Sequence, residues 1–103
     1  MGHHSMVDDL IDSFIEKWLD LDLQLREKRG LDGTLYQELM ALLKQIKAHL
    51  DGQDAIPKNL AEIFLDMWGA MTSSADLYDS DIQREIYQAA DHLSDRARAV
   101  CTG

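Results

Sequence analysis

Apolar residues recur at intervals of three and four along the chain, which is the spacing that gathers them on one side of an α-helix. Four segments carry this pattern, and turn-forming residues separate them. We therefore expect helices over about 7–28 and 34–50, from Pro57 to Met71, and from Ser80 to Val100. The apolar positions are Val7, Ile11, Phe14, Trp18, Leu21 and Leu25; then Leu35, Leu39, Leu42, Ile46 and Leu50; then Leu60, Phe64, Met67 and Met71, widened by Ile63 and Trp68; and finally Ile82, Ile86, Ala89, Leu93, Ala97 and Val100.

Capping residues support these boundaries. Asp32 or Thr34 is placed to cap the second helix, and Pro57 suits the first turn of the third. Ser80, with Gln83 three residues later, has the spacing of a capping box at the start of the fourth. The polar run 72–74 interrupts the apolar pattern, so we expect the third helix to end there.

One stretch of the first helix, Leu19–Leu25, alternates apolar and polar residues as a half-buried strand would. Helical patterns flank it on both sides and no other segment offers a partner strand. We therefore expect the helix to continue through it.

The segments suit a single all-α domain over residues 6–103, because this length forms one core and leaves no room for a second. Residues 1–5 have the composition of a histidine-tag remnant and are set aside. Links of about four to ten residues favour an antiparallel up-down-up-down four-helix bundle.

The balance of charge bears on the class of partner. Nineteen acidic residues against ten basic ones give a formal net charge of −9. Such a field repels phosphate backbones and anionic membranes, so we expect no nucleic-acid and no membrane binding. It favours association with a basic protein, although acidity for solubility alone is the simpler alternative. A single cysteine, Cys101, and the lack of an apolar run long enough for a bilayer agree with a cytoplasmic protein.

The sequence contains no recognisable catalytic or metal-binding motif. A di-iron bundle requires Glu-x-x-His, but Ile46 precedes His49 and Ala89 precedes His92 at that spacing. The acidic stretch 76–81 lacks the glycine and the distal glutamate of an EF-hand loop. We therefore expect neither metal nor cofactor and no enzymatic activity.

Histidine phosphotransfer is the alternative function, because acidic four-helix bundles with one phospho-accepting histidine serve that role. His92 is the candidate, and its neighbours on the helical surface are Glu85, Gln88 and Arg96. The sequence after it, Leu93-Ser94-Asp95-Arg96, lacks the lysine and glycine that usually follow such a histidine. The simpler interpretation is an exposed histidine paired with Glu85 or Gln88.

The first candidate binding surface is a tract without basic residues between Lys58 and Arg84. An exposed tyrosine among carboxylates is a combination that protein interfaces favour, with the ring as the anchor. The equally weighted alternative is a solvated loop with Leu77 or Tyr78 folded back onto the bundle. The candidate residues are Asp76, Tyr78, Asp79 and Asp81, followed by Glu62 and Asp66.

A second candidate surface lies on the outer side of the first helix, where acidic residues recur at every fourth position from Asp8 to Asp20. Aliphatic residues lie beside this stripe, beyond the main apolar positions. They indicate either a secondary binding face, a homodimer contact, or simply contact with two neighbouring helices. The candidates on this face are Ile15, Leu19, Asp20 and Leu23.

In size, charge and expected helical architecture the chain resembles bacteriocin-type immunity proteins, although no family motif can be matched residue by residue. The resemblance implies a bacterial immunity or antitoxin-type protein whose acidic face inhibits a toxin such as a nuclease. The leading functional hypothesis is thus a protein-binding module that neutralises or escorts a basic partner. Phosphotransfer through His92 and a structural homo-oligomeric bundle are the alternatives.

Overall fold

A computed structural model describes residues 6–53 and 55–102, so the suggested tag at residues 1–5 lies outside the described residues. The described chain forms four α-helices and no strands: α1 (Met6–Arg26), α2 (Gly33–Leu50), α3 (Lys58–Ala75) and α4 (Ser80–Thr102). The predicted all-α four-helix architecture is confirmed. The stretch Leu19–Leu25 is helical, as expected from its flanks.

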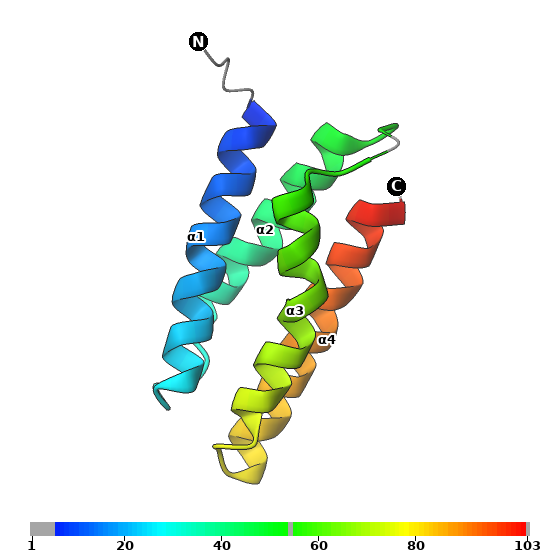
Figure 1. Ribbon diagram of the computed structural model, residues 1–103. Coiled ribbons are helices and arrows are strands. Elements are labelled where there is room, and N and C mark those ends of the chain that lie inside the picture. The colour runs from blue at the N-terminus through cyan, green and yellow to red at the C-terminus, as the bar shows by residue number, and fades with distance from the viewer. Residues whose placement is uncertain (1–5, 54, 103) are drawn as a thin grey trace.

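The chain direction alternates from helix to helix, and the four helices form an elongated bundle of 46 × 27 × 20 Å (Figure 1). The pairs that pack together are α1 with α2, α2 with α4, α4 with α3, and α3 with α1. Helices α2 and α3 therefore lie on a diagonal, and the link 51–57 spans it. As a consequence α1 and α3 are neighbours that run in the same direction.

Most of the core consists of apolar positions that the periodicity predicts, and Leu43, Ala75 and Ala90 are buried in addition to them. Phe14 and Leu21 of α1, Leu39 of α2 and Leu93 of α4 have no exposed surface. Phe14 also meets Phe64 of α3 edge to face, with ring centroids 5.9 Å apart. An aromatic pair of this kind adds about 0.5–1.5 kcal/mol beyond the burial of its surface. This contact fixes α1 against α3 where the two helices are parallel.

Helix α1 ends two residues earlier than predicted. The backbone N–H of Arg29 donates to the Gln24 carbonyl, and that of Lys28 donates to the Leu25 carbonyl. These two hydrogen bonds form a Schellman motif, in which the residue at the position of Lys28 takes a left-handed conformation. Lys28 has a φ of 61°. The chain then turns through Gly30 into α2, which Asp32 caps by accepting from the Leu35 N–H at 3.1 Å.

Helix α3 continues through 72–74 to Ala75, so the predicted end near Met71 is wrong. Thr72 is buried within the helix because its hydroxyl donates to the Trp68 carbonyl at 2.9 Å. A hydroxyl that bonds back to the preceding turn satisfies its own polarity and needs no solvent. The link between α3 and α4 is accordingly only 76–79.

The cap of α4 is also displaced by one residue from the prediction. Asp79, rather than Ser80, accepts the hydrogen bond from the Ile82 N–H, at 3.2 Å. The Gln83 side chain reaches back to the Ala75 carbonyl at the end of α3. Asp79 therefore stabilises the start of a helix, which matters for any variant made at this position.

Candidate functional site

Tyr78 does not form the exposed anchor that the sequence suggested. It is half-buried, and its hydroxyl donates to the Leu25 carbonyl at 2.8 Å and accepts from the Gly30 N–H at 3.0 Å. The folded-back alternative is therefore correct for Tyr78, whose ring and hydroxyl belong to the fold. Leu77 beside it is 48% exposed.

The remaining acidic candidates are exposed, but the structure does not bring them into one surface. Glu62 and Asp66 lie one turn apart on α3, whereas Asp76, Asp79 and Asp81 surround the link to α4. Ten residues of rise separate Asp66 from Asp76, which is about 15 Å along the helix axis. The predicted tract is thus two separate acidic groups.

Of the secondary candidates on α1, Leu19 lines a groove between α1 and α3. Leu19 and Leu23 are 54% and 43% exposed, Ile15 is half-buried against the core, and Asp20 is exposed. Leu19 shares a groove with Asp66, which belongs to the first predicted set. The structure therefore joins one member of each set, a proximity that helical periodicity within either segment could not reveal.

This α1–α3 groove is a surface hollow of about 490 Å³ between the two parallel helices. Its lining combines aliphatic and aromatic carbon with two carboxylates, and it contains no basic residue. The lining residues are Trp18, Leu19, Asp22, Ile63, Asp66, Gly69, Ala70 and Ser73. A groove of this composition is chemically suited to an aliphatic stem that carries a positive charge.

The charge of the α1–α3 groove is only partly balanced within the protein. Asp22 Oδ2 pairs with Arg26 Nε at 3.3 Å, as the i,i+4 spacing suggests, while its enclosed Oδ1 has no hydrogen-bond partner among the described residues. No described lysine or arginine forms an ion pair with Asp66. The groove thus keeps a net negative charge.

Gly69 lies in the middle of α3 and lines the same groove. A glycine inside a helix costs about 1 kcal/mol relative to alanine. A Cβ added at Gly69 would meet no atom within 4 Å, and the residue's φ lies outside the left-handed region. Packing within the described chain therefore gives no reason for a glycine here.

His92 is exposed on α4, and its partner is not the predicted Glu85 or Gln88. Its Nδ1 and the Tyr36 hydroxyl of α2 are hydrogen-bonded at 3.2 Å. Burial raises the pKa of Tyr36, against the opposing influence of the Arg96 charge. The pair links α2 to α4, and phosphotransfer through His92 stays a prediction.

No three histidine, cysteine, aspartate or glutamate side chains within 6–53 and 55–102 are grouped so as to hold a metal ion. None of the described helices has the length and apolar character that crossing a membrane would require.

Comparison with known proteins gives no family: the chain matches no protein-family model, no curated protein and no solved structure.

Proposed function

We propose that the protein is a small acidic protein-binding module that neutralises or escorts a basic protein. In its most specific form the proposal is an immunity or antitoxin-type inhibitor of a toxin. The observation that carries it is the α1–α3 groove, where Asp66 provides a negative charge that no ion pair balances and no basic residue belongs to the lining.

Recognition in this proposal combines a cationic side chain with an apolar contact. A lysine or arginine of the partner lies along the α1–α3 groove, with its alkyl stem on Leu19 and its charge at Asp66. Asp22 is not contacted in this proposal, because its Oδ1 is enclosed and its Oδ2 pairs with Arg26. Lysine and arginine stems commonly cover apolar surface while their charged ends meet carboxylates.

The open space over Gly69 also supports binding of a partner at the α1–α3 groove. Glycine permits another backbone or a bulky group to approach a helix closely. The space over Gly69 is open, so its missing side chain leaves room for the partner at the cost of some helix stability. The overall charge of −9 contributes by accelerating the encounter with a basic protein.

The test is capture of the partner with matched variants. The wild-type chain, Asp66→Lys and Asp81→Lys are immobilised and exposed to an extract of the source organism at low salt. The expected result is a basic protein retained by wild type and by Asp81→Lys but lost with Asp66→Lys. Asp81 is the control because it is exposed and undergoes the same charge change, whereas Asp79 caps α4 and would perturb the fold.

The inhibitory form of the proposal has its own readout. Expression of the captured protein in a host that lacks this chain is expected to arrest growth, and co-expression of the chain is expected to restore it. If the captured protein has no such effect, the role in toxin inhibition is refuted, whereas the role in binding a basic protein is not. Retention by Asp66→Lys together with loss by Asp81→Lys would place binding at the α3–α4 link instead.

A further inference from the structure

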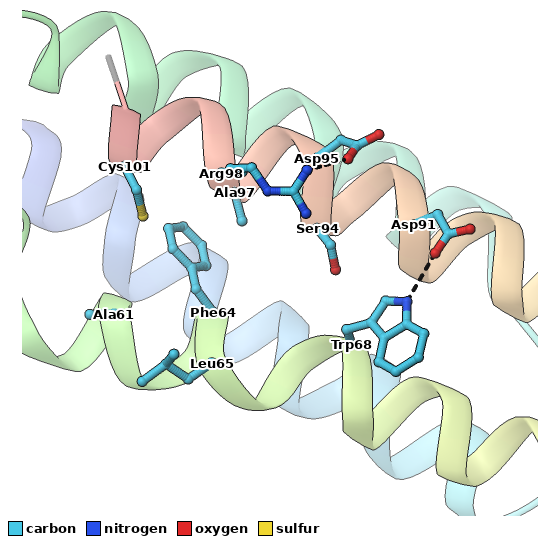
Figure 2. A pocket seen from close by; sticks show the side chains of 10 residues that line it. All are labelled: Ala61, Phe64, Leu65, Trp68, Asp91, Ser94, Asp95, Ala97, Arg98 and Cys101. Carbon is cyan, nitrogen blue, oxygen red and sulfur yellow. Dashed lines mark hydrogen bonds and ion pairs between the residues drawn. The ribbon is translucent and has the colours of Figure 1, made fainter.

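A second hollow, the α3–α4 groove, lies on the other side of α3 and encloses about 790 Å³ (Figure 2). Phe64, Leu65 and Trp68 of α3 line one wall, and Asp91, Asp95 and Cys101 lie along the α4 wall. The lining runs from Asp91 to Cys101, which is about 15 Å or three helical turns along α4. None of the predicted candidate residues lines this groove, and Glu62 lies beside it on α3.

Its apolar wall is unusually accessible. Leu65 is 83% exposed and Trp68 is 46% exposed, although large apolar side chains on helices generally face a core. The Trp68 indole N–H donates to Asp91 Oδ1 at 2.9 Å, which holds the ring across the gap between the helices. The held Trp68 ring and the exposed Leu65 therefore present an apolar surface to solvent. Contiguous exposed apolar surface of this kind marks binding sites.

The rims of the groove are acidic. Asp95 and Arg98 pair at 3.1 Å and cancel each other, which leaves Asp91 on the α4 side. Glu62 is exposed on α3 three residues before Leu65, so the two side chains are neighbours on the helix surface. An apolar floor between negative rims is complementary to a helix with an apolar stripe between positive flanks. A second copy of this chain is a poor match, because its own groove has the same negative rims and each copy carries −9.

We propose that the α3–α4 groove binds an amphipathic basic helix of the partner protein. This inference rests on the proposed function for the basic character of the partner, and it adds the kind of element that is recognised. One face of the partner helix places aliphatic side chains against Leu65 and Trp68, spaced i, i+4 and i+7. Lysine or arginine residues beside that face meet Asp91 and Glu62.

The test uses a synthetic probe. A helix-forming peptide of about 14 residues, roughly 21 Å long, carries leucine at i, i+4, i+7 and i+11 with lysine on the flanks. A control peptide has the same composition with the leucines dispersed around the helix. Cys101 is the only cysteine of the chain and is exposed in the groove, so its alkylation by iodoacetamide reports on occupancy.

The expected result is that a saturating amount of the amphipathic peptide slows alkylation of Cys101 by about fivefold or more and shifts the Trp68 indole N–H resonance, whereas the dispersed peptide does neither. Leu65→Lys is expected to lower the affinity for the amphipathic peptide by about tenfold or more. This variant leaves the fold intact because the side chain contributes little to the core. Wild-type affinity in Leu65→Lys, or equal protection by both peptides, would overturn the proposal.

The same experiment separates this inference from the proposed function. Asp66→Lys alters the α1–α3 groove and is expected to leave protection of Cys101 by the peptide within about twofold of wild type. Absence of any protection in wild type would refute the helix-binding groove while leaving capture of a basic protein through Asp66 unaffected. Dimerisation of the chain that itself protects Cys101 would assign the groove to a second copy and overturn the inference.

Discussion

The hydroxyl of Tyr78 donates to the carbonyl oxygen of Leu25 at 2.8 Å, across a sequence separation of 53 residues. The same hydroxyl accepts from the Gly30 N–H, so it connects the link between α3 and α4 with the turn between α1 and α2. Both connections lie at one end of the bundle (Figure 1). The tyrosine within the acidic tract therefore holds two loops together.

Removing this hydroxyl tests the structural role of Tyr78. Tyr78→Phe is expected to lower the free energy of unfolding by about 1–2 kcal/mol, because the Gly30 N–H loses its acceptor and the Leu25 carbonyl loses a donor. Urea denaturation measures the change. Partner binding is expected to stay at the wild-type level. Unchanged stability together with lost binding would instead identify Tyr78 as an interface residue.

The left-handed residue at the end of α1 offers a stabilising substitution. A left-handed conformation costs a residue with a side chain about 1–2 kcal/mol, of which the greater chain entropy of glycine offsets roughly half. Lys28→Gly is therefore expected to raise the free energy of unfolding by about 0.5–1 kcal/mol in the same assay. Lys28→Ala removes the charge but keeps the unfavourable φ of 61°, so it serves as the control and should give no such gain.

Gly69 is expected to show opposite effects on stability and on binding. Gly69→Ala should raise the free energy of unfolding by about 0.5–1 kcal/mol, since the new methyl group meets no atom within 4 Å and alanine favours the helix. The same methyl group protrudes into the α1–α3 groove and should lower the affinity for the partner by about threefold or more. Thermal unfolding and calorimetric titration provide the two readouts.

A matched control for Gly69 lies on α2. Ala41 is exposed in the interior of that helix, away from both grooves. Ala41→Gly should destabilise the protein by about the amount that Gly69→Ala stabilises it, with binding unchanged. If Gly69→Ala stabilises the fold and leaves the affinity for the partner unaltered, the groove is not where the partner's backbone approaches.

Alkaline pH is expected to destabilise the fold through Tyr36. Burial raises the pKa of Tyr36 above its ordinary value of 10.0, so the folded state retains this proton more tightly than the unfolded chain. The stabilisation is complete below pH 10 and is lost as the pH rises through the folded-state pKa. Tyr36→Phe should make the decline in unfolding free energy above pH 10 shallower. An identical decline in the variant would show that Tyr36 contributes nothing to it.

Lys17 acts in the same pH range and provides a comparison. The hydrogen bond it donates to Glu38, at 2.6 Å between Nζ and Oε2, raises the pKa of Lys17 above 10.5. Its contribution is likewise present below the unfolded-state pKa and lost at higher pH. The Lys17→Met variant should therefore also reduce the alkaline decline.

The core could be predicted from sequence because burial in a helix follows a fixed period. Ile11, Leu39, Leu60 and Ile86 occupy predicted apolar positions and are buried. Trp68 is one exception: the spacing predicts that it widens the apolar side of α3, but it is 46% exposed, and its indole N–H donates to Asp91 on α4. The spacing of apolar residues predicts which side of a helix is buried, but it does not predict a polar contact with another helix.

The candidate site could be predicted only in part, since the α1–α3 groove depends on which helices are neighbours. The sequence predicts Leu19 and Asp66 as candidates, each within its own segment. Their proximity follows from the diagonal placement of α2 and α3, which makes α1 and α3 adjacent. Short links are compatible with more than one such order, so periodicity and link length leave the pairing of surfaces open.

In the proposed function, Asp66 in the α1–α3 groove binds a cationic group of the partner. The most direct test is calorimetric titration of the captured partner with Asp66→Lys and Asp81→Lys under identical salt. Asp66→Lys should leave the free energy of unfolding within about 0.5 kcal/mol of wild type, whereas Asp81→Lys should lower it by about 1 kcal/mol, because Asp81 lies in the first turn of α4. We predict that Asp66→Lys weakens binding by about a hundredfold or more and Asp81→Lys by less than about fivefold. Equal affinities for the two variants would contradict the account.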